Sequence, residues 1–183
     1  MEQPKGHGDG GWLMRWVLAV ATLPLGAFAG GLFGALHNQV SYRVSPDYFH
    51  GFKFQQFAVS PYFLNPAGAS LVGIGASWWM GLLLGIPIAV VALGEPTRGA
   101  QLRATLRGVA LAIVVTACAS LVGLALGFVF PTAADVSHYP GPIHDPVAFA
   151  SAGSMHNASY LGGALAFVVV PLALWYRRKR MPR

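Results

Sequence analysis

Long apolar stretches separated by polar, proline-rich segments dominate the chain. Four of them run from 16 to 36, 69 to 93, 108 to 130 and 158 to 176. Each can cross a hydrocarbon core of ~30 Å, which takes about 20 residues of helix. Because lipid cannot hydrogen-bond the backbone, each stretch is predicted to be helical. We therefore expect one all-α membrane domain over residues 1–183, a compact four-helix transmembrane bundle with long loops at 37–68 and 131–157.

Composition agrees with this prediction. Hydrophobic residues make up 55% of the 183 residues, charged residues only 10%, and the mean hydropathy is +0.54. An ordinary soluble domain has about 25% charged residues, so lipid is the expected surrounding of this chain. A removable secretory signal is an alternative for the first stretch, since Arg15 and Ala27-Phe28-Ala29 imitate its cleavage pattern. The apolar run continues to Leu36, which favours a retained helix.

Cations fall mainly on one side of a four-span arrangement. Of the 12 Lys and Arg residues, only Arg43 and Lys53 lie in the two long loops. Because Lys and Arg near span ends stay cytoplasmic, both termini are expected inside and both long loops outside. The net charge of +6 is then a topology signal with contact to anionic lipid, and nucleic acid is not an expected partner.

Small residues recur at every fourth position in three of the stretches. This spacing places each set on one helix face, where close backbone approach drives helix association in lipid. The stripes predict tight packing inside the bundle, although the same faces could contact another subunit. The packing positions are Gly26, Gly30, Gly34, Gly73, Ser77, Gly81, Gly85, Gly123 and Gly127.

A polar phrase occurs twice, as His37-Asn38-Gln39-Val40-Ser41-Tyr42 and as His156-Asn157-Ala158-Ser159-Tyr160. The topology places both copies on the outer face, so the two imidazoles should lie close together if the first and last helices are neighbours. One interpretation is a polar network that closes this end of the bundle, since a buried unpaired polar atom costs ~1–3 kcal/mol. Besides the two histidines, its members would be Asn38, Ser41, Tyr42, Asn157, Ser159 and Tyr160.

A metal site is the second interpretation, because imidazole and carboxylate are ligands of zinc, copper and iron. The preferred ligands are His37 and His156 with His50 or Asp47, and the weaker ones are Asp135, His138, His144 and Asp145. Two axial histidines could also hold a haem, although such ligands normally lie deeper between apolar walls. The spacings match no tight metal signature, and a single cysteine, Cys118, excludes thiolate-rich sites.

The first long loop is predicted to contain a short helix. Ser45-Pro46-Asp47 combines a capping hydroxyl, a proline at the first helical position and an acid in the first turn. The aromatic residues within 48–57 favour a helix lying in the membrane interface, or a ridge that binds a partner.

The runs at 41–49, Phe52-Lys53-Phe54 and Ser77-Trp78-Trp79-Met80-Gly81 resemble small multi-span bacterial proteins of unassigned function. The resemblance covers the first half of the chain. It implies a bacterial inner membrane, with the long loops on the periplasmic side, and it implies no activity, cofactor or site.

Two functions of different class follow. The first is a non-enzymatic accessory subunit or assembly scaffold that binds other membrane helices or a second copy of itself. The second is a metal-binding protein of the outer face, for metal handling or for chemistry on a lipid-phase substrate. Enzymatic activity is not the favoured expectation, because no nucleophile motif is present. A transporter is also disfavoured, since no span holds Asp, Glu, Lys, Arg or His between its ends.

Overall fold

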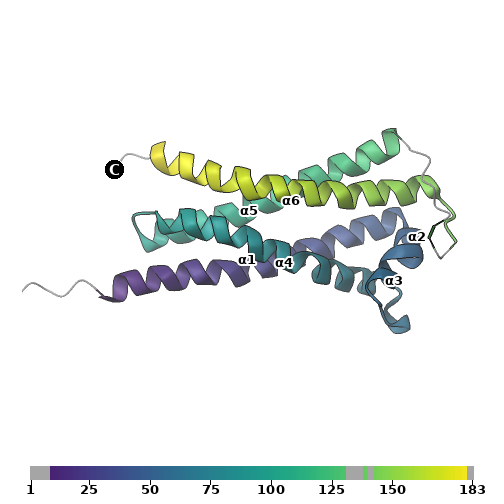
Figure 1. Cartoon of the computed structure of the whole chain (residues 1–183), viewed down its shortest axis with the longest axis horizontal. Coiled ribbons are helices and arrows are strands. Elements are labelled where there is room, and N and C mark those ends of the chain that lie inside the picture. Colours follow the sequence, from purple (N-terminus) through teal and green to yellow (C-terminus); the bar gives the residue numbers. More distant parts are fainter. Residues whose placement is uncertain (1–8, 131–137, 140–141, 181–183) are drawn as a thin grey trace, which may run out of the picture.

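The computed structural model describes residues 9–130, 138–139 and 142–180. Four long helices make up most of this part of the chain: α1 (Asp9–Val44), α4 (Pro66–Leu93), α5 (Arg98–Val129) and α6 (Pro146–Arg180). They lie side by side, and the described ranges contain no strand (Figure 1). All four are long and apolar enough to cross a membrane. The predicted all-α class is confirmed for the described residues, and the four candidate spans are consistent with a multi-pass membrane protein.

The helices form two tight hairpins. α1 packs chiefly on α4 and α5 chiefly on α6, and the two pairs meet over a smaller contact. α1 begins, α4 turns into α5, and α6 ends at the same end of the bundle (Figure 1). We call it the arginine end, after Arg103, Arg177 and Arg178, and the opposite end the histidine end, after His37 and His156. A core between the hairpins consists of Leu84, Ile88, Ala112, Ala166, Val170 and Leu174.

The small-residue stripes lie in the seams of the hairpins. A methyl group on Gly34 of α1 would overlap the carbonyl oxygen of Gly73 on α4. A methyl group on Gly123 of α5 would likewise crowd the backbone of Ser154 on α6. Because the opposing atoms are backbone, no side chain can turn aside to make room. The stripes are thus occupied by close helix contacts within the chain.

Side-chain caps set where the helices begin. Asn65, Thr97 and Asp145 each accept a hydrogen bond from the backbone N–H three residues further on, which starts α4, α5 and α6. The helices are longer than the apolar stretches alone indicate. Residues 37–44 and 146–157, expected in the long loops, are helical because no proline interrupts them after the first helical position. Both copies of the polar phrase therefore lie on helices.

Short helical turns link α1 to α4 and cover the histidine end (Figure 1). They are α2 (Pro46–Tyr48), η1 (Phe49–Lys53), α3 (Phe54–Gln56) and η2 (Pro61–Phe63). The predicted start of the first is confirmed, since the Ser45 side chain accepts a hydrogen bond from the Tyr48 N–H and Pro46 is the first helical residue. The turns and the adjoining helices share an aromatic core, which we call the cap: Tyr48, Phe49, Phe54, Ala69, Val72, Phe149 and Ala152.

Candidate functional site

The two copies of the polar phrase meet at the histidine end. The ring centroids of His37 on α1 and His156 on α6 lie 4.6 Å apart, with the rings perpendicular at 88°. Both side chains are buried, at 7% and 6% exposure. The Oγ of Ser41 lies 3.1 Å from Nε2 of His156, which pairs them by a hydrogen bond. The first and last helices of the bundle thus bring the two imidazoles into contact.

The Nε2 atom of His37 is buried and has no hydrogen-bond partner in the described part of the chain. Such an atom costs ~1–3 kcal/mol when it stays unpaired. Native proteins rarely tolerate this cost, and such groups often mark a bound water, an ion or a functional role. His37 therefore retains the capacity to bind a ligand, whereas the Nε2 of His156 is engaged.

Rings of the cap pack around His156. The ring centroids of Tyr48 and Phe49 lie 5.0 Å and 6.3 Å from that of His156. Phe49 is completely buried. Burial raises the pKa of the Tyr48 hydroxyl above its ordinary value, so this group remains protonated. Aromatic side chains of the cap thus separate the histidine pair from solvent.

Lys53, to which the sequence analysis gave no role, is buried inside the cap. Its Nζ donates a hydrogen bond to Oε1 of Gln56 at 2.9 Å and lies 4.7 Å from the Phe52 ring centroid. Burial lowers the pKa of this ammonium group. The hydrogen bond and the cation–π contact offset part of the desolvation cost. The aromatic neighbours Phe52 and Phe54 were the one sequence signal that pointed to burial.

The structure divides other candidate ligands into separate pairs. Nε2 of His50 lies 3.1 Å from the hydroxyl of Tyr42. Asp47 accepts a hydrogen bond from the backbone N–H of His144 at 2.7 Å, and the His144 ring lies 3.3 Å from the same carboxylate. The backbone hydrogen bond is the main cause that lowers the pKa of Asp47. These residues therefore fasten loop segments to one another rather than converge on the buried pair.

The remaining candidates do not complete a ligand shell. Asp145 caps the start of α6, His138 lies in the short stretch 138–139, and Asp135 falls outside the described residues. Across residues 9–130, 138–139 and 142–180, no three His, Cys, Asp or Glu side chains come together as a metal site would require. A metal ion between His37 and His156 would receive two ligands from the described chain.

Polar side chains of the first phrase also fasten α1 to α4. Nδ2 of Asn38 donates a hydrogen bond to the carbonyl of Ala69 at 2.9 Å. Gln39, which the sequence analysis did not single out, donates to the Pro66 carbonyl at 2.6 Å and to the Ser70 hydroxyl at 2.8 Å. The first copy of the phrase therefore serves the hairpin as well as the histidine pair.

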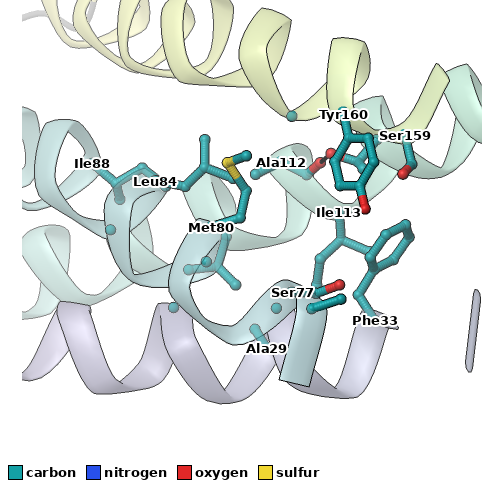
Figure 2. A pocket seen from close by; sticks show the side chains of 18 residues that line it. Ala29, Phe33, Ser77, Met80, Leu84, Ile88, Ala112, Ile113, Ser159 and Tyr160 are labelled. Carbon is teal, nitrogen blue, oxygen red and sulfur yellow. Dashed lines mark hydrogen bonds between the residues drawn. The ribbon is translucent and has the colours of Figure 1, made fainter. Parts of the chain in front are cut away.

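The second copy faces partly away from the first. Ser159 donates to the carbonyl three residues earlier in its own helix, and Asn157 is exposed. Tyr160 points into a crevice between the hairpins, toward Ser77 and Phe33 (Figure 2). The crevice has a volume of about 70 Å³, well below the ~300 Å³ of a small-molecule pocket. It is therefore a packing defect of the seam and not a ligand site.

Residues 57–64 form the last part of the segment between α1 and α4, and we call them the aromatic projection. Ala58 adopts a left-handed backbone with φ 48°, which ends α3 and redirects the chain. Tyr62 is 89% exposed, and Phe57, Phe63 and Leu64 are exposed as well. Clusters of exposed aromatic residues mark contact with another protein or with membrane headgroups.

Comparisons with protein-family models, with curated proteins and with solved structures found no match for this chain. The class of protein follows from the fold and the hydropathy. The described fold is all-helical, and its four candidate spans are consistent with a multi-pass membrane protein.

Proposed function

We propose that the protein is a non-enzymatic accessory subunit or assembly scaffold that binds another membrane protein or a second copy of itself. The observation that supports this most is the aromatic projection. Tyr62 is 89% exposed, whereas Tyr48 and Phe49 of the same loop are buried. The segment between α1 and α4 thus buries some of its aromatic side chains in the cap and exposes others on the surface. Aromatic residues of this kind supply much of the binding energy at protein interfaces.

The contact surface in this proposal differs from the small-residue stripes. Gly34 and Gly73 face each other within the hairpin, so their faces are not free for another helix. A partner is therefore expected at the histidine end, beside the projection, and not along the seams.

We further propose that the histidine end faces the periplasm across a bacterial inner membrane, with the cap in the interface. The cations at the opposite end support this orientation, because Arg and Lys near span ends are retained in the cytoplasm. They include Arg15, Arg98, Arg103, Arg107, Arg177, Arg178, Lys179 and Arg180.

Native-size analysis after gentle extraction tests the scaffold function. The wild type is expected to run as an assembly larger than one 19.3 kDa chain with its detergent. The variant Tyr62→Ser/Phe63→Ser should run as a monomer with unchanged helix content. Phe28→Ser, at a lipid-facing position that is 72% exposed, is the matched control and should keep the assembly. A wild type that runs as an isolated monomer would sink the proposal.

Metal handling is the second candidate, and the histidine pair supports it. The ring centroids of His37 and His156 are 4.6 Å apart. Nε2 of His37 is buried and has no hydrogen-bond partner in the described chain. Imidazole suits zinc, copper and iron, with bond lengths of about 2 Å. Two protein ligands leave the remaining positions to water or to a partner. Such an open shell leaves coordination positions through which a bound ion can be transferred to a partner.

Metal analysis of the detergent-purified protein, after incubation with each metal and desalting, tests this candidate. The wild type should retain about one ion per chain, and His37→Ala and His156→Ala should fall to background. His144→Ala is the control, since that exposed ring belongs to the Asp47 pair. Background content in the wild type contradicts metal handling and leaves the scaffold function untouched.

A further inference from the structure

A cleft of about 1240 Å³ opens at the arginine end, between the start of α5, the end of α6 and the turn that joins α4 to α5. This volume is ample for a polar headgroup. Its charged lining consists of five cations and one carboxylate: Arg103, Arg107, Arg177, Arg178, Lys179 and Glu95.

Most cations of the cleft have no ion-pair partner among the described residues. Arg103 and Arg107 are four residues apart on α5, where like charges destabilise a helix. Within the described ranges, neither of them forms an ion pair, and the same holds for Arg177 and Lys179. Glu95 is buried, and its single charge offsets at most one of the five. An anion in the cleft would relieve this repulsion.

One cation is fixed by the backbone and helps to shape the cleft. Nη1 of Arg178 donates a hydrogen bond to the carbonyl of Val91 at the end of α4, at 3.3 Å. The same guanidinium packs against Gly94, where a methyl group would collide with it. The end of α6 is thus attached to the α4–α5 turn, which holds the two walls of the cleft together.

The surroundings of the cleft match a membrane boundary. Trp175 and Tyr176 are partly exposed on α6, as in the aromatic belts at the headgroup level. The Lys179 Nζ lies 3.9 Å from the Trp175 ring centroid, and the Arg180 guanidinium lies 4.4 Å from that of Tyr176. These contacts hold the cationic groups beside the apolar surface of the helix.

The beginning of α5 adds a further attraction for anions. Thr97 and Ala100 in its first turn line the cleft. The amino end of a helix carries a partial positive charge that attracts phosphate, while the Ala100 N–H is already bonded to the Thr97 hydroxyl. α5 is 32 residues long, so this end effect is fully developed.

We propose that this cleft binds the phosphate group of an anionic phospholipid. Arg103 and Arg107 contact it from α5 and Arg177 from α6, since arginine forms paired hydrogen bonds with phosphate oxygens. The acyl chains lie along the exposed apolar side chains of α5 and α6 beside the cleft. The binding site is independent of the aromatic projection and of the histidine pair.

Native mass spectrometry of the full chain tests this site, with titration of phosphatidylglycerol or phosphatidylcholine in detergent. The wild type should bind phosphatidylglycerol more tightly than phosphatidylcholine. Arg103→Gln/Arg107→Gln should weaken phosphatidylglycerol binding about 25-fold, from about fivefold for each charge. Arg43→Gln/Arg180→Gln removes the same charge outside the cleft lining and should change it less than about twofold.

Three results would overturn the proposal. If the protein binds phosphatidylglycerol and phosphatidylcholine with equal affinity, the cleft does not recognise the charge of the headgroup. If both double variants lose phosphatidylglycerol affinity equally, binding is due to general surface charge. Displacement of the lipid by millimolar inorganic phosphate makes free phosphate the ligand instead. Circular dichroism checks that each variant is folded, and Arg177→Gln, with about a fivefold loss expected, decides the outcome if the α5 variant does not fold.

Discussion

Single atoms determine how the histidine end is closed. The hydroxyl of Ser41 engages His156, while Nε2 of His37 keeps no partner in the described chain. Lys53 lies nearby under aromatic rings with its charge largely desolvated. In the seam between α1 and α4, the missing side chain of Gly34 is what lets the two helix backbones come into contact.

Replacing Gly34 by alanine should separate the helices of the first hairpin. The added methyl group would overlap the carbonyl oxygen of Gly73, which cannot turn aside, so a loss of about 1–3 kcal/mol is expected. Gly31→Ala is the matched control, since its methyl group would lie 3.5 Å from Cγ2 of Ile74, an ordinary contact. The midpoint of thermal unfolding in detergent is measured for both variants. Equal midpoints would contradict the close contact between Gly34 and Gly73.

The buried charge of Lys53 should make stability depend on alkaline pH. In the folded protein, burial lowers the pKa of Lys53 below its ordinary value of 10.5. The unfolded chain therefore binds this proton more tightly. The folded state therefore gains stability as pH rises between the lowered pKa and 10.5. Wild type is expected to gain stability relative to Lys53→Met as pH rises toward 10.5. A pH-independent difference in thermal midpoint would refute the buried ammonium group.

At the scale of elements, extension of the helices past the apolar stretches creates the site. α1 continues to Val44 and α6 begins at Pro146, so His37 and His156 lie on rigid helices and not on loops. The cap then covers them with short turns that depend on a few polar links. One of these links joins α2 to the segment before α6, through Asp47 and the backbone of His144.

Asp47→Asn should loosen this link. The hydrogen bond from the His144 N–H lowers the pKa of Asp47 below 3.8, so the carboxylate stabilises the fold above that value. Its contribution is lost as pH falls through the lowered pKa. Asp47→Asn should therefore be less stable than wild type near about pH 6, and the difference should shrink as pH falls below 3.8. His144→Ala keeps the backbone donor and should lose less, and an equal loss would assign the link to the ring.

At the scale of the whole molecule, two hairpins stand side by side, and the charged side chains of the described residues lie toward their two ends. The small crevice between them is lined by no Asp, Glu, Lys, Arg or His side chain. One end holds the buried histidines and the aromatic projection, and the other holds the cationic cleft. A membrane protein of this shape can contact partners and lipids at its two ends without opening a path across the bilayer.

The proposed orientation predicts a labelling pattern. In a Cys118→Ser background, Tyr62→Cys and Arg180→Cys each provide one thiol, and Tyr62 is 89% exposed. A membrane-impermeant maleimide should label Tyr62→Cys in intact spheroplasts, and Arg180→Cys only after lysis. The reverse pattern would place the arginine end outside and contradict the positive-inside assignment.

Properties that depend on neighbouring residues could be predicted without tertiary structure. Length and apolarity indicate the four helices, because a backbone in lipid must form its hydrogen bonds within its own segment. The hydroxyl of Ser45 followed by Pro46 indicates a helix start for the same local reason. Glycine spacing indicates which faces pack closely, although not which helix lies opposite. The sequence by itself thus determined the class of the protein and the ends of the bundle where its polar groups gather.

Tertiary structure alone decided which of those polar groups meet. His37 and His156 are 119 positions apart, and only the packing of α1 beside α6 brings their rings to 4.6 Å. The same packing leaves His50 and Asp47 with other partners, buries Lys53 and exposes Tyr62. The physical reason is that burial and hydrogen-bond partners depend on contacts between distant segments, and the periodicity of a chain does not encode which helices become neighbours.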